Sequence, residues 1–174
     1  MRRLLRKDWP SLGRKFGYGI LLGINCGCML HLFQRYIGGP KPAYGPSMLP
    51  TLAVQGELLL ENNLSYWLNP KSIARGDLVS FVSPINPQRL ACKRVIGLPG
   101  DVVCVDPTGE KAPSTEHVIV PKGHYWLSGD NAAASRDSRW YGPVSGRLIR
   151  GKVVAKIWPP RSWTVFRNPV SYID

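Results

Sequence analysis

The hydrophobic positions of the chain fall into one long run near the N-terminus and many short runs after it. The long run covers residues 16–33 and is interrupted only by Asn25 and His31. Its length matches that of a helix of about 20 residues, which is what a lipid bilayer requires. No A-x-A-like cleavage site follows the run, which disfavours a cleaved signal peptide. We therefore predict an uncleaved membrane anchor over residues 16–37, with a buried core helix as the alternative.

The residues before this run form a basic tail, residues 1–15. The tail has a net charge of +5, from Arg2, Arg3, Arg6, Lys7, Arg14 and Lys15 against Asp8. Basic flanks of a transmembrane helix stay on the side where the protein is made or imported. We therefore expect the tail to stay on that inner side and everything after Tyr36 to cross the membrane.

Short runs rich in β-branched and aromatic residues follow, separated by turn-forming residues. Such runs without alternating helical segments are typical of an antiparallel β domain. The expected strands are Glu57–Glu61, Asp77–Val82, Ala91–Ile96, Asp101–Val105, His117–Val120, His124–Ser128 and Lys152–Trp158. The Gly/Pro-rich segment 38–46 is predicted to be a non-helical linker, and segment 106–116 a surface loop. Residues 38–174 are thus expected to form one mostly β domain.

Composition narrows the classes of function. The net charge of +12 at first suggests a nucleic-acid or membrane partner. The part outside the tail contains no continuous basic run and no nucleic-acid motif, so nucleic-acid binding becomes the last alternative and we predict none. Four Cys are too few for a disulfide scaffold of this length. Because there is no CxxC or Cys/His cluster, we predict no metal and no cofactor.

Ser47 is the first candidate for chemistry. It stands in Y-G-P-S-M-L-P-T, where Gly and Pro predict an irregular turn that exposes the hydroxyl and leaves nearby N–H groups free to bind an oxyanion. A turn serine with no catalytic role is the alternative. Beyond the anchor only His117 and His124 occur, both in or beside expected strands, so a Ser-His-Asp triad is hard to build.

Lys93 is the candidate partner of this serine. In A-C-K-R-V-I-G-L it alternates with apolar residues, so its side chain is expected to point inward. An apolar environment disfavours the charged amine and lowers its pKa from about 10.4. A neutral amine can accept the proton of a serine hydroxyl, as in Ser/Lys variants of the triad. A surface lysine on an edge strand, beside Arg94, is the alternative.

The segment 128–143 is the third candidate and is dense in turn formers and charges. Asp137 and Arg139, two residues apart, are suited to bracing a loop through a charge-assisted hydrogen bond. Ser135 and Ser138 offer hydroxyls that could orient an amine. A solvated loop would have a similar composition.

Four motifs, in this order, resemble the type I signal peptidase family. They are G-P-S-M-L-P-T around Ser47, R-G-D-L-V-S-F at residues 75–81, K-R-V-I-G-L-P-G-D at residues 93–101 and S-G-D-N…S-R-D-S-R-x-Y-G at residues 128–142. The resemblance implies a signal-peptidase-like antiparallel β catalytic domain with one N-terminal transmembrane helix. It also implies a serine endopeptidase that removes targeting peptides from precursor polypeptides through an acyl-enzyme.

The resemblance also implies roles for single residues. Ser47 matches the nucleophile of the family and Lys93 its general base. Ser135 matches a serine that hydrogen-bonds the lysine, while Asp137 and Arg139 match a pair that supports the site.

Substrate contacts are expected around the same residues. In the family the substrate lies extended beside the strand that matches Asp77–Val82, as an added strand. Met48, Leu52 and Cys92 flank the dyad and, with Ser80, are expected to line a shallow pocket for small side chains.

Two departures indicate the branch of the family. The endoplasmic reticulum relatives use His where this chain has Lys93, and bacterial members often have a hydroxyl residue where this chain has Gly45. The second departure leaves more of the oxyanion hole to the backbone N–H of Ser47. Sequence detail is most similar to the mitochondrial inner membrane peptidases.

This branch predicts a single-pass protein of the mitochondrial inner membrane, in contact with lipid. Its N-terminus would lie in the matrix and its catalytic domain in the intermembrane space, beside a paralogous second catalytic subunit. A bacterial-type leader peptidase of the plasma membrane is the alternative enzyme. An inactive anchor or assembly subunit that binds exported segments is the alternative without catalysis.

Overall fold

The computed structural model describes residues 9–109 and 112–167 of the chain, which divides into two compact units, Met1–Ile37 and Gly38–Asp174. The first unit contains helix α1, Trp9–Tyr36. Within it, Gly13–Tyr36 is long and apolar enough to cross a membrane. The helix therefore begins inside the expected basic tail, and the expected tail residues 1–8 lie outside the described residues.

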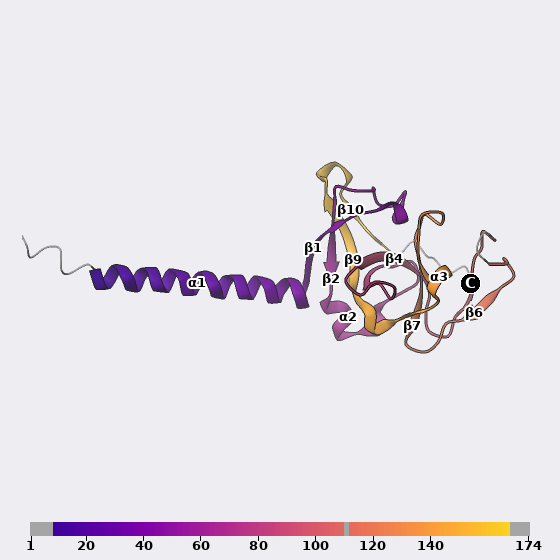
Figure 1. Ribbon diagram of the computed structural model, residues 1–174, viewed down its shortest axis with the longest axis horizontal. Coiled ribbons are helices and arrows are strands. Elements are labelled where there is room, and N and C mark those ends of the chain that lie inside the picture. Colours follow the sequence, from indigo (N-terminus) through magenta and orange to yellow (C-terminus); the bar gives the residue numbers. More distant parts are fainter. Residues whose placement is uncertain (1–8, 110–111, 168–174) are drawn as a thin grey trace, which may run out of the picture. The chain divides into compact units, whose positions relative to one another are not determined.

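The second unit is built on one antiparallel sheet with the strand order β1-β2-β9-β3-β4-β7-β8 (Figure 1). β10 pairs with β9, and β5 and β6 form a separate hairpin. The strands are β1 Gly38–Ala43, β2 Glu57–Asn62, β3 Leu78–Val82, β4 Leu90–Gly97, β5 Val102–Cys104, β6 His117–Ile119, β7 His124–Ser128, β8 Val144–Ser145, β9 Ile149–Trp158 and β10 Thr164–Val165. The mostly antiparallel β fold predicted from the sequence is confirmed.

Short helical turns connect these strands. They are η1 Pro46–Met48, α2 Leu64–Leu68, η2 Pro70–Ser72, α3 Ser138–Tyr141, η3 Gly146–Leu148 and η4 Pro160–Ser162. The register of β9 shifts against β2 and β3, and that of β4 shifts against β7. Such bulges bend and twist the strands that carry them, and the sheet curls accordingly (Figure 1).

Two of the three core clusters of the described residues lie next to the candidate site. One cluster includes Val79 and Phe81 of β3 and Val95 of β4. The other includes Met48 at the end of the Ser47 turn and Leu59 of β2. Alternate residues of one strand point to opposite faces. Neighbouring residues of β3 and β4 therefore belong to different clusters. The candidate site lies where these two strands meet the turn that carries Ser47.

The segment predicted as a linker is the main error in the expected fold. Residues 38–43 form strand β1, which pairs with β2 from Gly38 opposite Asn62 to Ala43 opposite Glu57. Because β1 pairs on one side only, Pro40 and Pro42 do not interrupt a ladder, and edge strands tolerate proline for this reason.

Candidate active site

The turn that carries Ser47 is the 3-10 helix η1, and glycine is required just before it. Gly45 has φ of 103° and ψ of 157°, in a region that residues with a Cβ rarely adopt. Its N–H donates to the carbonyl of Val54 at 2.7 Å, which closes the loop behind the turn. This backbone geometry is a physical reason why no hydroxyl residue stands at position 45.

Lys93 is buried because of its place on β4. It shares a strand face with Ala91 and Val95, both of which contact the first core cluster, and its own exposure is 4%. Burial lowers the pKa of Lys93, and the charge of Arg89 lowers it further, against the opposing effect of the carboxylates of Asp137 and Asp130. Burial thus favours the neutral amine at lower pH than in an exposed lysine.

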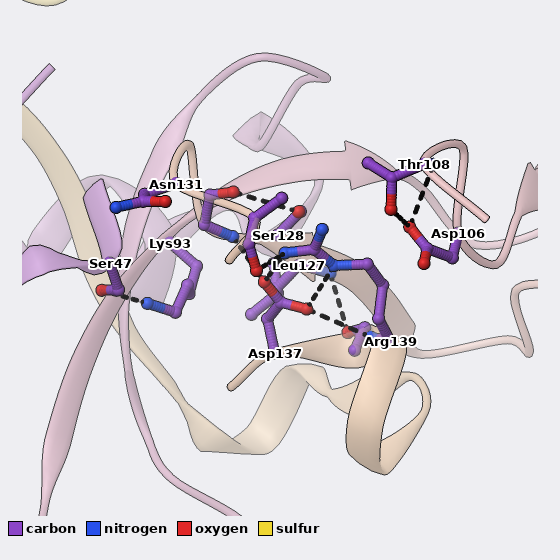
Figure 2. A network of polar contacts seen from close by, with 12 residues as sticks. Ser47, Lys93, Asp106, Thr108, Leu127, Ser128, Asn131, Asp137 and Arg139 are labelled. Atoms are coloured by element: carbon purple, nitrogen blue, oxygen red, sulfur yellow. Dashed lines mark hydrogen bonds and ion pairs between the residues drawn. The ribbon is translucent and has the colours of Figure 1, made fainter. Parts of the chain in front are cut away.

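The two side chains meet, although 46 positions separate them in the chain. Lys93 Nζ lies 2.5 Å from Ser47 Oγ, and Figure 2 shows the two side chains pointing toward each other. A neutral amine at this distance can accept the hydroxyl proton directly, which is the geometry required of a general base. The pair has the elements of an activated nucleophile.

Asp137 and Arg139 form the ion pair that the sequence predicted, deep below the loop that follows β7. Arg139 donates from Nε to Oδ1 at 2.9 Å and from Nη2 to Oδ2 at 2.6 Å, and the side chains are 5% and 0% exposed. Asp137 also accepts the Gly129 N–H at 2.9 Å. Burial alone would raise the pKa of Asp137, but these hydrogen bonds outweigh it and hold the pKa below its usual value.

Ser135 lies beside the nucleophile but does not make the expected bond to Lys93. Its exposure is 3%, and its Oγ has no hydrogen-bond partner within the described part of the chain. A Cβ built on Gly129 would collide with Ser135 Oγ and would approach the Ser47 carbonyl oxygen to 2.5 Å. Ser135 is thus close to the Ser47 backbone, while its hydroxyl is not committed to the lysine in this structure.

Replacing Gly129 by alanine is therefore expected to lower kcat at least roughly tenfold, because small displacements of reacting groups cost this much or more. The added methyl group must push apart the Ser135 side chain and the Ser47 backbone. The measurement is the rate of precursor cleavage by the purified variant, with thermal unfolding recorded alongside. A Gly129→Ala protein with unchanged kcat would contradict the close packing described above.

A second network near the dyad was not anticipated. Arg94 donates to Asp130 from Nε at 2.8 Å and from Nη2 at 2.6 Å, and Thr51 Oγ1 donates to the same carboxylate at 2.5 Å. Arg94 also donates to the Gly76 carbonyl at 2.9 Å. This network ties the nucleophile loop, the lysine strand and the loop after β7 together.

Asn131 completes this connection. Its side-chain amide donates to the Pro46 carbonyl at 3.1 Å, and its backbone N–H donates to the Ser47 carbonyl at 3.1 Å. The only signal in the sequence was that Thr51, Arg94 and Asn131 lie inside the motifs that carry the candidate residues. Their roles depend on contacts across 18 or more positions, which local patterns do not reveal.

The four expected pocket residues lie on two neighbouring parts of the site. Met48 and Leu52 are each 3% exposed and pack in one cluster with the half-buried Cys92. Ser80 is opposite Cys92 in the β3–β4 pair, and its hydroxyl donates to the buried carboxylate of Glu61. Burial raises the pKa of the Cys92 thiol to about 12, so this thiol stays protonated and is not a nucleophile at neutral pH.

The expected position of the substrate beside β3 is wrong. β3 is paired with β4 from Leu78 to Val82 and with β9 from Leu78 to Phe81, so neither edge can accept a further strand there. β4 does have an open edge. It pairs with β7 only from Arg94 onward, which leaves the second edge of residues 90–93 without a partner strand in the described structure.

The two histidines of the domain lie away from the dyad. His117 Nδ1 contacts the Thr115 carbonyl at 2.8 Å, and His124 Nδ1 contacts the Lys122 carbonyl at 3.1 Å. Each ring thus contacts the backbone two residues before it. Lys93 is the basic side chain that reaches Ser47 in the described structure.

Known proteins match this chain over most of its length. The family model described as signal peptidase, peptidase S26, matches residues 18–111 and 106–158. Mitochondrial inner membrane protease subunit 1 of Xenopus tropicalis is 40% identical over 163 residues, covering 94% of this chain and 90% of that protein. The human protein of the same name is 43% identical over 159 residues, covering 91% and 88%.

Two further matches cover less of this chain. Mitochondrial inner membrane protease subunit 2 of Saccharomyces cerevisiae is 40% identical over 124 residues, covering 68% of this chain and 67% of that protein. A crystal structure of a signal peptidase I from Enterococcus faecalis matches 47% of this chain and 97% of its own, with 25% identity and a TM-score of 0.38. The family model and the sequence relatives span the turn, the lysine strand and the loop after β7, and the chain belongs to the signal peptidase family, peptidase S26.

Proposed function

We propose that this protein is a membrane-anchored serine endopeptidase of the mitochondrial inner membrane, with Ser47 as nucleophile and Lys93 as general base. The observation that carries the proposal is the 2.5 Å approach of a buried lysine amine to the hydroxyl of a turn serine. The names of the relatives support the compartment and the peptidase activity.

In the proposed mechanism, neutral Lys93 accepts the hydroxyl proton while Ser47 Oγ attacks the scissile carbonyl. The oxyanion of the tetrahedral intermediate is bound by the backbone N–H of Ser47, which is positioned by η1. The lysine then returns the proton to the leaving amine, and the C–N bond breaks to give an acyl-enzyme. Water deprotonated by Lys93 hydrolyses the ester and restores Ser47.

Ser135 takes part in this cycle as a positioning residue. Its buried hydroxyl has no other partner within the described residues and lies next to the Ser47 backbone. We assign it to accept a hydrogen bond from the Lys93 ammonium when that group forms. Asp137 and Arg139 support the loop that carries Ser135, through the hydrogen bond of Asp137 to the Gly129 N–H.

The substrate in this proposal lies along the open edge of β4, residues 90–93, instead of along β3. An extended peptide there forms backbone hydrogen bonds with β4 and brings its scissile bond to Lys93 at the end of the open edge. Met48, Leu52, Cys92 and Ser80 then form the floor beneath the substrate side chains. The close packing of Met48 and Leu52 leaves little room, which favours small side chains.

The expected domain organisation implies which segments of the chain lie on each side of the membrane. The basic tail, residues 1–15, stays in the matrix, the anchor at residues 16–37 spans the membrane, and the catalytic domain, residues 38–174, faces the intermembrane space. Relatives are named as subunits 1 and 2 of one inner membrane protease. We therefore propose that this chain works as the subunit 1 partner of a paralogous second catalytic subunit.

The proposal is tested by mapping protein N-termini in mitochondria that depend on this chain. When Ser47→Ala replaces the wild type, precursors that the enzyme normally cuts are expected to accumulate with longer N-termini at the inner membrane. Comparison with the wild type gives the cleavage sites and the residue before each scissile bond. Unchanged N-termini together with normal assembly of the second subunit would instead indicate an inactive assembly subunit.

A further inference from the structure

With α1 as the membrane anchor of the proposed function, on which this inference rests, one corner of the catalytic domain is covalently tied to the membrane. α1 ends at Tyr36 and β1 begins at Gly38, so Ile37 alone lies between them. One residue spans at most about 3.6 Å, so Gly38 is within about 7 Å of the last helical residue. Gly38 is paired with Asn62 at the end of β2, and adjacent strands are about 4.8 Å apart. The start of α2, at Leu64, is therefore tied to the end of α1 by a short stretch of chain and one pair of strand residues.

α2 presents apolar side chains at this corner. Trp67 is 72% exposed and Leu68 is 66% exposed. The helix itself is firmly held, because Tyr66 donates its hydroxyl to the Gly146 carbonyl at 2.6 Å and the Ser65 N–H donates to Asn62 Oδ1 at 3.1 Å. Two large apolar side chains are thus held outward by a docked helix, although no core residue of the described structure covers them.

Three exposed basic residues belong to segments that follow or contact the α2 region. Lys71 is exposed in the turn that follows α2. Arg147 is exposed and directly follows Gly146, the residue that accepts the Tyr66 hydroxyl. Arg150 is exposed and directly precedes Gly151, where an added Cβ would collide with the backbone and side chain of residues 62 and 63. None of the three forms an ion pair with a carboxylate of the described residues.

We propose that this α2 surface, formed by Trp67, Leu68, Lys71, Arg147 and Arg150, binds the surface of an anionic lipid bilayer. Tryptophan is favoured at the boundary between headgroups and acyl chains, and basic residues around an apolar face favour anionic lipids. The covalent tie at Gly38 holds the surface at the bilayer, so even weak lipid contacts are made at high effective concentration. The bound surface restricts the tumbling of the catalytic domain on its anchor.

The first test uses the full-length protein with Ser47→Ala in lipid nanodiscs, so that it does not depend on catalysis. Discs contain phosphatidylcholine and phosphatidylglycerol, with or without bromine on the acyl chains to quench nearby tryptophans. The emission lost on Trp67→Phe reports Trp67 alone. We expect this component to be quenched at least roughly twofold by brominated lipid, since an interfacial ring contacts the acyl chains.

Trp140→Phe is the matched control, because Trp140 is similarly exposed at 62% but lies on α3. The component that it removes is expected to be unaffected by bromine. Equal emission of the Trp67 component in both kinds of disc overturns the proposal. If that component changes only after the second catalytic subunit is added, the surface is a protein interface and the proposal is also overturned.

The second test examines the basic residues by hydrogen exchange of residues 64–72. We expect slower exchange in anionic than in zwitterionic discs, by roughly fivefold for each basic residue that contacts lipid, and a smaller difference at high salt. The triple variant K71Q, R147Q and R150Q should lose the difference between the two lipids. If the triple variant keeps the difference in exchange between the two lipids, the assignment of these residues is overturned. Thermal unfolding in detergent shows whether the variants remain folded.

Discussion

Replacing Lys93 by methionine is expected to lower kcat by roughly 10³-fold or more, with little change in KM. Methionine fills a similar volume in the buried position, so the loss reports the missing amine. Lys93→Arg is expected to be as inactive, because a guanidinium keeps its proton and cannot act as a base. Substantial activity of the arginine variant would show that position 93 needs only a positive charge, and the dyad would be wrong.

Ser47→Ala is expected to lower kcat by as much as either substitution at position 93. In the double variant Ser47→Ala/Lys93→Met, kcat is expected to equal that of the single variants, since the two residues act as a unit. The measurement is steady-state cleavage of a precursor peptide by the purified full-length protein in lipid. Lys122→Met, at an exposed position away from the dyad, is the control and should retain wild-type kcat.

The pH dependence gives an independent test of the same base. Burial lowers the pKa of Lys93, and only its neutral form accepts the Ser47 proton. In the wild type, kcat/KM is therefore expected to rise with pH and to level off above a midpoint that is lower than the ordinary lysine value of about 10.4. A midpoint near that ordinary value would contradict the burial of a catalytic amine.

Replacing Arg139 by methionine is expected to lower the free energy of unfolding by about 3–5 kcal/mol. Asp137 is fully buried, and in the variant its carboxylate would lose the guanidinium partner and keep the two backbone N–H donors. Arg75→Met is the matched control, because Arg75 forms an equally short two-point pair with Asp101 but is 34% exposed. An exposed ion pair contributes about 1 kcal/mol or less to the free energy of unfolding, so Arg75→Met is expected to lower that free energy by no more than this.

The loss caused by Arg139→Met should depend on pH with a definite sign. In the wild type the pKa of Asp137 is lowered, so its contribution to stability is present above the unfolded value of about 3.9 and falls as the pH drops through the lower, folded value. In the variant, burial favours the protonated carboxyl. The difference between the proteins should therefore be largest near pH 7 and shrink at acid pH. Chemical unfolding in detergent micelles at several pH values measures it, and a constant difference would contradict the assignment.

The strands that were predicted share one property. β3, β4, β5, β6, β7 and β9 carry β-branched or aromatic residues, and β2 carries three consecutive leucines between turn-forming segments, so their local pattern is sufficient. β1 lacks such residues and forms because β2 offers it a partner, and no local pattern reports that. α2 and α3 span five and four residues, which is too short for a helical period to emerge.

The residues of the candidate site also divide into those that the sequence around them indicates and those that depend on distant contacts. Ser47 and Lys93 could be named as candidates because the motifs around them resemble those of the signal peptidase family, and Asp137 and Arg139 because they are also near neighbours in the chain. The partners of Asp130 could not, since Thr51 and Arg94 lie 79 and 36 positions away. The position of the substrate was predicted wrongly for a related reason. Which edge of a strand is open depends on the order of the strands in the whole sheet.

The point at which β7 joins β4 has a consequence for how a cleavage position is chosen. β7 occupies the edge of β4 from Arg94, the residue directly after Lys93. For a peptide bound as proposed along residues 90–93, this junction is the end of the available edge, whatever the sequence of the peptide. We therefore expect the length of paired peptide along this edge to set which bond reaches Lys93. Contacts with the side chains would then decide only which residues are accepted there.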